Sequence, residues 1–557
     1  MTATAEQYTV RHRETLDRAL QAIRERAFWT PYPELPKAYG EQAAADGKAA
    51  YEGYLGGAFP LVQPGTDEMV GGERSPYGAE LGITYPHPDL DELLPAMRAA
   101  MPRWRDAGPD ARATVLIEAL ARLNARTTEI AYAVHHTSGQ AFGMAFQAGG
   151  PHAQDRGLEA VAYAYAAQTA QVAAAEWEKP QGPKPALRMA KKFTAVPRGI
   201  GLVIGCNTFP TWNSYPGLFA SLATGNAVVV KPHPNAILPL AITVAVLRDT
   251  LSEAGFDPNL VALAVEKPGE GLAKVLATRP EVRIIDYTGS TEFGLWLERN
   301  AAQAVVYTEK AGINTVVVDS VGDDDYKGML GNLAFSFSLY SGQMCTTPQN
   351  IFVPRGGITV GGEHKSFDDF GSDLAGAVEK LLGDDARANA LLGAVCNAGV
   401  SERLKKAESV GKTVLASRSV ANAEYPEAEV RTPLIAAIDA ADSEVYTGEW
   451  FGPISFLIAV DDTDAAIETF RRTVREHGAI TASVYSTDDA VIERTEEAAL
   501  DAGVNLSVNL TGGVYVNQSA AFSDFHATGA NPAANSALSD LAYVANRFRV
   551  VQSRRHI

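Results

Sequence analysis

The sequence predicts an α/β protein built around two doubly wound parallel sheets, and three observations lead to this prediction. Short continuous apolar runs, such as 200–204 and 227–230, are typical of strands buried on both faces. A helical segment at 238–251 follows them, and strand–helix–strand alternation at this spacing predicts a parallel sheet. A second region with the same alternation begins near residue 314.

The composition restricts the classes of function and partner. The chain has 557 residues, too many for one hydrophobic core, so we expect two or three domains. Its net charge of −18 argues against nucleic acid or an anionic membrane as a partner. No apolar run approaches the length of a membrane span, and residues 1–6 lack a signal-peptide pattern. Three cysteines give no disulfide framework and fit a reducing cytosol, so we expect a cytoplasmic protein.

The first 80 residues are predicted to form a helix and an arm. Leu16, Leu20 and Ile23 recur at helical spacing with charges between them, which predicts an amphipathic helix over 11–29. Residues 31–90 are rich in glycine and proline and show little periodicity. We therefore expect an extended arm packed on the main body.

The next segment is helical by pattern. One helix is predicted near 112–133 and an alanine-rich helix at 158–175. His135 and His136 end a helix that Gly139 is predicted to cap. The histidine pair suggests either a metal site or a polar helix end. We favour the helix end, and predict no metal, because no cysteine or carboxylate stands at ligand spacing.

Strands are then predicted in two regions. The first holds strands at 200–204, 227–230, 260–265 and 282–287. The second holds strands at 315–318, 351–353, 454–460 and 480–485. The composition does not change between the regions, so the motifs described next place the boundary near residue 310.

A lysine and a glycine turn mark a ligand site at two strand ends. Lys231 directly follows a buried strand, where open α/β sheets bind ligands, and could bond ribose hydroxyls or a 2′-phosphate. A solvated loop lysine is the other interpretation. Gly289 and Ser290 follow a strand and begin a helix, whose free N–H groups attract a pyrophosphate. The G-x-G-x-x-G pattern is absent, because Gly199 and Gly201 are followed by isoleucine at position 204.

Cys345 is a candidate nucleophile. It follows Gly342 among small polar neighbours rather than within an apolar run. A thiol needs a base or a lowered pKa to attack at neutral pH, and Glu309 could act as that base directly or through water. A small core residue is the other interpretation.

Together these motifs resemble those of the NAD(P)-dependent aldehyde dehydrogenase superfamily, in its order and at its spacings. The resembling segments are GNAVVVKP at 225–232, TGSTEFG at 288–294, EKAG at 309–312, GQMC at 342–345 and EWFGP at 449–453. The resemblance implies that Cys345 is the nucleophile and Glu309 the general base. It also implies a cofactor site made of Lys231, Gly289, Ser290, Gly294, Glu449 and Phe451.

The resemblance further implies the domain organisation. We expect an N-terminal extension at 1–80, a cofactor-binding α/β domain at 81–308 interrupted near 179–197, a catalytic α/β domain at 309–530 and a C-terminal return at 531–557. A β-hairpin oligomerisation arm is implied, with strand candidates at 190–196 and 547–552. A homodimer or homotetramer is expected.

The oxyanion-holding residue departs from the family pattern. The family places a catalytic asparagine 23 residues before the ribose-binding lysine, and that position is Thr208, with Asn207 one residue off. There are two alternatives. A one-residue bulge brings Asn207 to the position of the catalytic asparagine, or Thr208 replaces the amide as the donor to the oxyanion. Asn213 is a second candidate whose spacing is too short. Cys206 lies close by in this alignment and is interpreted as a core residue.

The cofactor preference also departs from the commoner pattern. Many NAD-specific members carry a glutamate three residues after the lysine, where this chain has Pro234. Without that carboxylate a 2′-phosphate is less repelled, so NADP is favoured over NAD.

The substrate is expected to be a small aldehyde. The N-terminal extension and the segments 207–212, 309–314 and 345–350 most resemble the PaaN-type proteins of bacterial phenylacetate degradation. This resemblance implies a CoA-linked semialdehyde as substrate.

The predicted reaction oxidises the aldehyde to a carboxylic acid. Cys345 forms a thiohemiacetal and then a thioester, and Glu309 activates the water that releases the acid. A CoA-acylating dehydrogenase is an alternative, against which Glu309 argues. A catalytically decayed binding protein is a second alternative. A thiol hydrolase is a third, but it needs a histidine partner that the sequence does not reveal.

Overall fold

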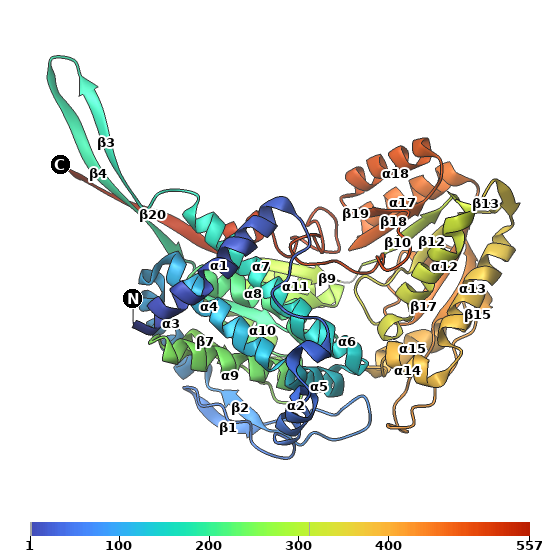
Figure 1. Cartoon of the computed structure of the whole chain (residues 1–557), viewed down its shortest axis with the longest axis horizontal. Helices are drawn as coiled ribbons and strands as arrows, with labels where there is room; N and C mark the ends of the chain where they lie inside the picture. The colour runs from blue at the N-terminus through green and yellow to red at the C-terminus, as the bar shows by residue number, and fades with distance from the viewer. Residues whose placement is uncertain (1–2, 311) are drawn as a thin grey trace.

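The computed structural model describes residues 3–310 and 312–557, which form two α/β bodies and a projecting β-arm (Figure 1). Met1 and Thr2, in the segment predicted to lack a signal peptide, lie outside the described residues. Ala311, in the predicted general-base motif, does so too. The α/β class predicted from the sequence is confirmed.

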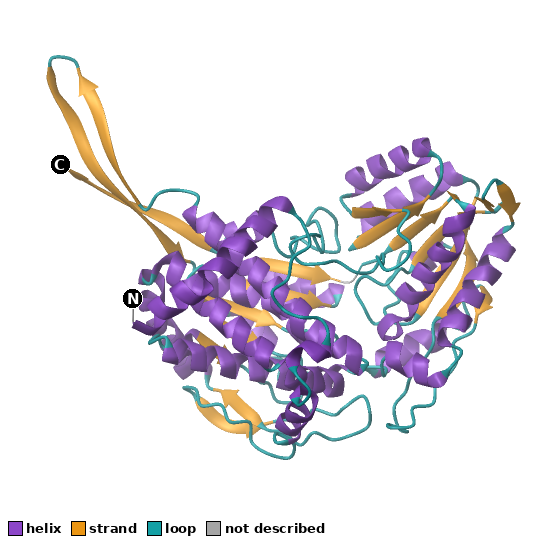
Figure 2. Cartoon of the chain, in the orientation of Figure 1, coloured by secondary structure: helices purple, strands orange, loops and turns teal. Residues whose placement is uncertain are grey.

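The first body contains a parallel sheet of five strands in the order β7-β6-β5-β8-β9. The strands are β5 (Ile200–Ile204), β6 (Ala227–Lys231), β7 (Val261–Leu263), β8 (Val282–Gly289) and β9 (Val305–Lys310). Every residue of β5 and β6 is buried, as their uninterrupted apolar runs predict, because helices cover both faces of the sheet (Figure 2). β9 spans the boundary proposed at residues 308 and 309, and the domain division stays a proposal.

The second body contains a sheet of seven strands in the order β15-β16-β17-β12-β10-β18-β19. The strands are β10 (Thr315–Val318), β12 (Asn350–Pro354), β15 (Lys412–Leu415), β16 (Leu434–Asp439), β17 (Ile454–Val460), β18 (Thr481–Tyr485) and β19 (Asn505–Val508). All pairs are parallel except β15 with β16. A small sheet of β11 (Ser320–Val321), β13 (Ile358–Val360) and β14 (Glu363–Lys365) lies beside it.

Helices surround both sheets. Those of the first body are α3 (Leu90–Asp106), α4 (Gly108–Ala125), α5 (Thr127–Ser138), α6 (Phe142–Gln147), α7 (Ala153–Thr169), α8 (Pro210–Ala223), α9 (Leu238–Glu253), α10 (Leu272–Thr278) and α11 (Thr291–Asn300). The later ones are α12 (Asp323–Ser338), α13 (Phe367–Leu382), α14 (Asp385–Leu391), α15 (Ala398–Ala407), α16 (Ser443–Tyr446), α17 (Thr463–His477), α18 (Asp489–Ala502) and α19 (Leu541–Ala545). In the described part of the chain, none of them has the length and apolar character needed to cross a bilayer.

The helix predicted near 112–133 is wrong in extent, because two helices occupy that segment. α4 ends at Ala125 and α5 begins at Thr127, with Arg126 outside helical geometry between them. The Arg126 side chain donates hydrogen bonds to Glu129 and Tyr54, so the residue between the two helices has its own hydrogen-bond partners. Gly139 caps α5 in the left-handed conformation, as predicted.

The N-terminal segment is more ordered than predicted. Helix α1 spans Ala3–Glu25, so it begins and ends earlier than the predicted 11–29. The segment predicted as an extended arm contains helix α2 (Ala43–Glu52) and strands β1 (Thr66–Val70) and β2 (Tyr85–Pro88). Within this segment Glu73 is buried and accepts hydrogen bonds from the Leu238 backbone N–H and the Tyr85 hydroxyl. The segment is therefore tied to the start of α9.

The arm is a three-stranded antiparallel sheet that leaves the first body (Figure 1). It consists of β3 (Ala174–Gln181), β4 (Lys184–Pro197) and β20 (Phe548–His556). The two segments predicted as arm strands pair with each other, with Val196 opposite Arg549 and Ala190 opposite Arg555. Most arm residues are exposed or half-buried in the single chain.

Candidate active site

The carboxyl ends of three parallel strands bring the predicted residues to one edge of the first sheet. Lys231 ends β6, Gly289 ends β8, and Glu309 lies near the end of β9 opposite Thr288. Ligands of open α/β sheets bind at this edge. Cys345 comes from the second body, between the short helix η4 (Leu339–Gly342) and β12.

The turn that carries Cys345 has a constrained backbone. Tyr340, Ser341 and Gly342 all have positive φ angles, of 55°, 50° and 64°. Such angles are costly for residues other than glycine, so the surroundings must enforce them. The Tyr340 hydroxyl donates to the Ser138 carbonyl of α5. A Cβ at Gly342 would lie 2.5 Å from the Gly452 carbonyl oxygen, so the turn packs directly against the 449–453 segment.

Cys345, His526 and Glu309 form a compact cluster. The His526 Nε2 lies 3.7 Å from the Cys345 Sγ and 3.0 Å from the Glu309 Oε1. The side chains of His526 and Glu309 are almost fully buried. Cys345 and Glu309 are 181 and 217 positions away from His526 in the chain, so only the fold brings the three together.

The cluster shifts the pKa values of its members. Burial, together with the nearby carboxylates of Glu309 and Glu449, raises the pKa of the Cys345 thiol well above its ordinary value. Burial alone would raise the pKa of Glu309, but the charge and hydrogen bond of a protonated His526 outweigh it and lower that pKa. The thiolate is therefore disfavoured unless a positive charge stands beside it.

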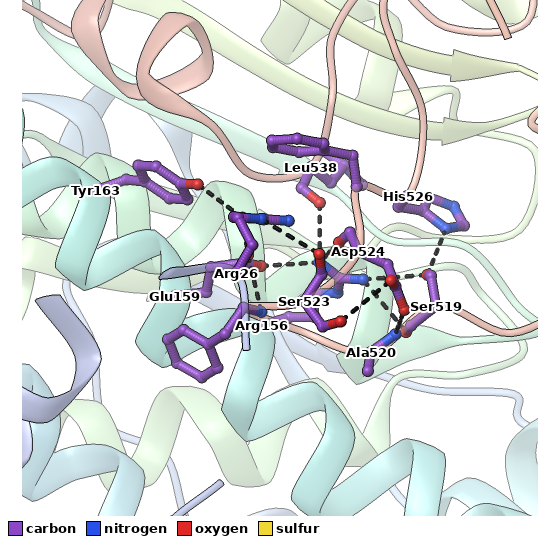
Figure 3. Close-up of polar contacts among 12 residues, drawn as sticks. Arg26, Arg156, Glu159, Tyr163, Ser519, Ala520, Ser523, Asp524, His526 and Leu538 are labelled. Atoms are coloured by element: carbon purple, nitrogen blue, oxygen red, sulfur yellow. Dashed lines mark hydrogen bonds and ion pairs between the residues drawn. The ribbon is translucent and has the colours of Figure 1, made fainter. Parts of the chain in front are cut away.

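A buried ion pair holds the loop that carries His526 (Figure 3). Arg156 of α7 is paired with Glu159 at 2.8 Å, with side chains that are 1% and 0% exposed. The same guanidinium donates to the Ser519 and Asp524 carbonyls, at 3.3 and 3.1 Å. Glu159 also accepts the Phe522 backbone N–H at 3.0 Å. The 519–526 loop is thus fixed to α7 at several points.

The segment after α1 covers the same loop. The Arg26 Nε donates to the Ser523 carbonyl at 3.3 Å, and its guanidinium lies 3.9 Å from the Phe525 ring centroid (Figure 3). Trp29 packs edge-on against Phe522, with ring centroids 5.2 Å apart. The N-terminal extension therefore contacts the loop on which His526 lies.

Removing the buried cation should destabilise the protein strongly. We expect Arg156→Met to lower the free energy of unfolding by about 3–5 kcal/mol, because Glu159 would keep a buried charge without its main partner. Denaturant unfolding at matched protein concentration measures this. Arg471→Met is the control: its pair with Glu468 has the same spacing but side chains that are 37% and 56% exposed, and we expect a loss of at most about 1 kcal/mol. Equal losses for the two variants would contradict the role given to the buried pair.

The structure gives a hydrogen-bond partner to each of the predicted oxyanion residues. The Asn207 amide donates to the Thr137 carbonyl at 3.1 Å, and its buried Oδ1 has no hydrogen-bond partner among the described residues. The Thr208 backbone carbonyl accepts a hydrogen bond from the Gln140 side-chain amide at 2.7 Å. Asn213, which the sequence spacing disfavoured, donates to the Glu309 Oε2 at 3.4 Å. Which residue holds the oxyanion stays a prediction, and Asn213 joins the candidates.

Cys206 is buried, as predicted, and its thiol donates to the Asn213 Oδ1 at 3.6 Å. Burial raises its pKa to about 11, so it stays protonated at neutral pH. It packs with Phe209 and Tyr340 beside the nucleophile turn. Cys206 therefore belongs to the wall of the site and not to its chemistry.

The residues predicted to bind a dinucleotide fit such a group. Gly289 has a φ angle of 158°, and a Cβ there would meet the Tyr287 hydroxyl at 2.5 Å. The exposed Ser290 caps α11, whose first N–H groups are available to a phosphate. A Cβ at Gly294 would meet the Lys310 side chain at 2.6 Å, so this turn of α11 packs closely on the sheet.

The two ends of the predicted cofactor site have carboxylates. Lys231 is paired with Glu266, which follows β7, at 2.6 Å. Burial raises the pKa of Glu449 to about 7. Glu449 and Phe451 line a small pocket with Met344 of the nucleophile turn. These two predicted cofactor-site residues therefore lie beside the turn that carries Cys345.

Among the described residues, Glu309, Cys345 and His526 are also close enough together to suit a metal ion, with ligand atoms within 4.8 Å of one another. A metal on Sγ would occupy the electron pair that a nucleophile uses. The absence of a metal at this cluster stays a prediction. His135 is instead buried and stacks on Tyr77, while the half-buried His136 stacks on Tyr51.

The sequence did not reveal His526 or Glu266, and its spacing disfavoured Asn213. His526 lies in a loop without periodicity, and nothing in its neighbourhood distinguishes it from a surface histidine. Glu266 follows a predicted strand as Lys231 does, and that shared position was the one available signal.

Three comparisons with known proteins agree with this geometry. A family model described as the aldehyde dehydrogenase family matches residues 84–537. The crystal structure of an NAD-dependent aldehyde dehydrogenase from Burkholderia multivorans is 58% identical and has a TM-score of 0.97, with 99% of each chain covered. The N-succinylglutamate 5-semialdehyde dehydrogenase of Burkholderia lata is 26% identical, over 74% of this chain and 78% of that protein. The 1-pyrroline-5-carboxylate dehydrogenase of Bacillus subtilis is 24% identical, over 84% of this chain and 88% of that protein.

Proposed function

The chain belongs to the aldehyde dehydrogenase family and is an NAD(P)-dependent oxidoreductase, and we propose that it converts an aldehyde to the acid through a thioester on Cys345. The observation that supports this most directly is the cluster of the thiol with one carboxylate and one imidazole. A covalent thioester divides a difficult oxidation and hydrolysis into two easier steps.

In the first half of the reaction Cys345 attacks the aldehyde carbon. The developing oxyanion is held by the Cys345 backbone N–H and by an amide or hydroxyl from Asn207, Thr208 or Asn213. When bound, a nicotinamide nucleotide would supply the hydride acceptor for this oxidation. Lys231, Gly289, Ser290, Gly294, Glu449 and Phe451 would hold that nucleotide.

In the second half Glu309 activates a water molecule, which attacks the thioester and releases the carboxylic acid. Glu309 is buried, and Asn213 and His526 fix its two carboxylate oxygens. A carboxylate positioned in this way argues against transfer of the acyl group to CoA, because that transfer uses no water and needs no base to activate it.

The test is reduction of the nicotinamide, followed by absorbance, with NAD and NADP and a panel of aldehydes. The panel includes aliphatic and aromatic aldehydes and a CoA-linked semialdehyde. Reduction that disappears in Cys345→Ala supports the proposal. Tight nucleotide binding without reduction for any aldehyde would contradict it and favour a binding protein.

We further propose a CoA-linked semialdehyde of aromatic catabolism as the substrate. Support comes from the resemblance of 207–212, 309–314 and 345–350 to PaaN-type proteins. The curated relatives named above carry the names of other substrates, and those names describe those proteins. We also propose a cytoplasmic homodimer or homotetramer that assembles through the arm of β3, β4 and β20.

For the cofactor we propose NAD over NADP. The preference for NADP inferred from Pro234 assumed that no carboxylate stands near Lys231, but Glu266 is bonded to that lysine at 2.6 Å. This carboxylate can accept hydrogen bonds from ribose hydroxyls and would repel a 2′-phosphate. The 58% identical protein from Burkholderia multivorans is named as NAD-dependent.

Glu266→Gln should shift this preference. We expect the Kd for NADP to fall at least about 10-fold relative to the Kd for NAD, because one like charge beside the 2′-phosphate is removed. Titration of both nucleotides by calorimetry measures the ratio without any aldehyde. Glu402→Gln, at an exposed position on α15, is the matched control and should leave the ratio unchanged. An unchanged ratio in Glu266→Gln would contradict the assignment.

A further inference from the structure

His526 offers the Cys345 thiol a partner that the two carboxylates near it cannot provide. Glu309 and Glu449 both disfavour a thiolate, and they raise the pKa of the thiol together with burial. Among the described residues, His526 is the one basic side chain that contacts the thiol, with Nε2 at 3.7 Å from Sγ. An imidazole can accept the proton and leave a cation beside the thiolate.

We propose that His526 is a further catalytic residue that accepts the proton of the Cys345 thiol. This inference rests on the dehydrogenase function proposed above. The S–H bond breaks and the proton moves to the Nε2 of the neutral imidazole, in the tautomer whose ring hydrogen is on Nδ1, facing Ser519. The sulfur electron pair then forms the C–S bond to the aldehyde, and the imidazolium is stabilised by the Glu309 carboxylate at 3.0 Å.

The same geometry orders the two halves of the reaction. While His526 carries the extra proton, its charge lowers the pKa of Glu309 and makes that carboxylate a weaker base. Glu309 therefore becomes an effective base for water only after the imidazolium has released its proton. The overall reaction releases one proton to solvent, and the balance is met when this proton leaves from His526. The Nδ1 lies 3.5 Å from the hydroxyl of the half-exposed Ser519.

The charged and titratable groups around His526 are compatible with its role as the acceptor of the Cys345 proton. β9 supplies Glu309, the nucleophile turn supplies Cys345, and its own loop supplies the neutral Ser519. From α8 the Trp212 ring packs edge-on at 4.7 Å between ring centroids. The next cation, Arg156, lies over Trp212 and is engaged with Glu159. No second cation competes with His526 for the thiol within the described part of the chain.

The position of His526 is fixed rather than adjustable. Arg156, Glu159 and Arg26 all form hydrogen bonds with this loop (Figure 3). A base that transfers a proton over a short distance must be held at that distance. The ion pair and the N-terminal extension therefore act as positioning elements for this imidazole.

The test measures the reactivity of the thiol rather than turnover. The full-length protein is treated with iodoacetamide over a range of pH, and alkylation of the Cys345 peptide is followed by mass spectrometry. We expect His526→Gln to slow alkylation near neutral pH by about 100-fold, because the thiol loses its base. At high pH, where the thiol ionises unaided, the variant should approach the wild-type rate. His364→Gln, an exposed histidine of the second body, is the control and should behave as wild type.

A second variant separates chemistry from structure. In His526→Gly, added imidazole should restore alkylation and turnover, a response that a merely structural role would not give. An unchanged pH profile in His526→Gln, or no rescue of a folded His526→Gly, would overturn the inference. If neither variant folds, the pH profile of alkylation in the wild-type protein decides. An alkylation rate that rises only once, above the ordinary thiol pKa, would overturn the inference.

The inference and the proposed function can fail separately. Full dehydrogenase activity in His526→Gln with none in Cys345→Ala would overturn the role of His526 and leave the dehydrogenase intact. Alkylation that depends on His526 in a protein that oxidises no aldehyde would support the proton transfer and contradict the proposed function.

Discussion

Cys345→Ala is expected to reduce the rate of aldehyde oxidation by at least about 10⁴-fold, to the limit of detection. The thiol is the one group of the cluster that can form a covalent bond with the aldehyde carbon, and removal of a nucleophile typically leaves only residual catalysis. Nucleotide binding should remain, because Lys231 and Gly289 are supplied by other elements. The measurement pairs steady-state nicotinamide reduction with calorimetric titration of the nucleotide.

The control for this variant is Cys396→Ala. Cys396 is buried with Val395 and Val400, outside the cluster, and its pKa is raised to about 12 by burial. We expect this variant to keep aldehyde oxidation within a few-fold of wild type. Activity retained in Cys345→Ala, or lost equally in both variants, would contradict the assignment of the nucleophile.

Glu309→Gln is expected to separate the two halves of the reaction. The first enzyme-equivalent of nicotinamide should be reduced in a burst, and turnover after the burst should fall by about 10²–10⁴-fold, because water loses its base. Glutamine keeps an oxygen that can accept the hydrogen bond from His526 Nε2, so the cluster can retain its geometry. Stopped-flow absorbance resolves the burst from the steady state.

A slow first turnover in Glu309→Gln, without any burst, would show that the carboxylate acts before the thioester forms. That result would move the proton-accepting role from His526 to Glu309. The burst amplitude should equal the concentration of reactive Cys345, which iodoacetamide titration gives independently.

Much of the fold followed from apolar patterning, because buried parallel strands are marked by uninterrupted runs. The strand predicted at 454–460 matches β17 (Ile454–Val460), and 315–318 matches β10. Helix α2 was missed because its packing depends on a glycine rather than on an apolar stripe. A Cβ at Gly47 would lie 2.7 Å from the Thr128 side chain, so α2 approaches α5 at that glycine. Such a contact leaves no periodic signal in the sequence.

The site was predictable only where a residue lies within a recognisable local motif. Cys345, Glu309 and Lys231 each stand in such a motif, and Lys231 ends β6, as its position after a predicted strand led us to expect. His526 and Glu266 act through contacts between segments distant in the chain. No spacing rule connects residue 526 with residues 309 and 345, so only the packing of the 519–526 loop reveals the third member of the cluster.

Mass spectrometry of acid-quenched Glu309→Gln, mixed with NAD and an aldehyde it oxidises, shows directly whether Cys345 carries the acyl intermediate. We expect one acyl group attached to the peptide that contains Cys345, in an amount equal to the nicotinamide reduced in the burst. Reduced nicotinamide without an acyl group on Cys345, or with the group on Cys206 or Cys396, would contradict it.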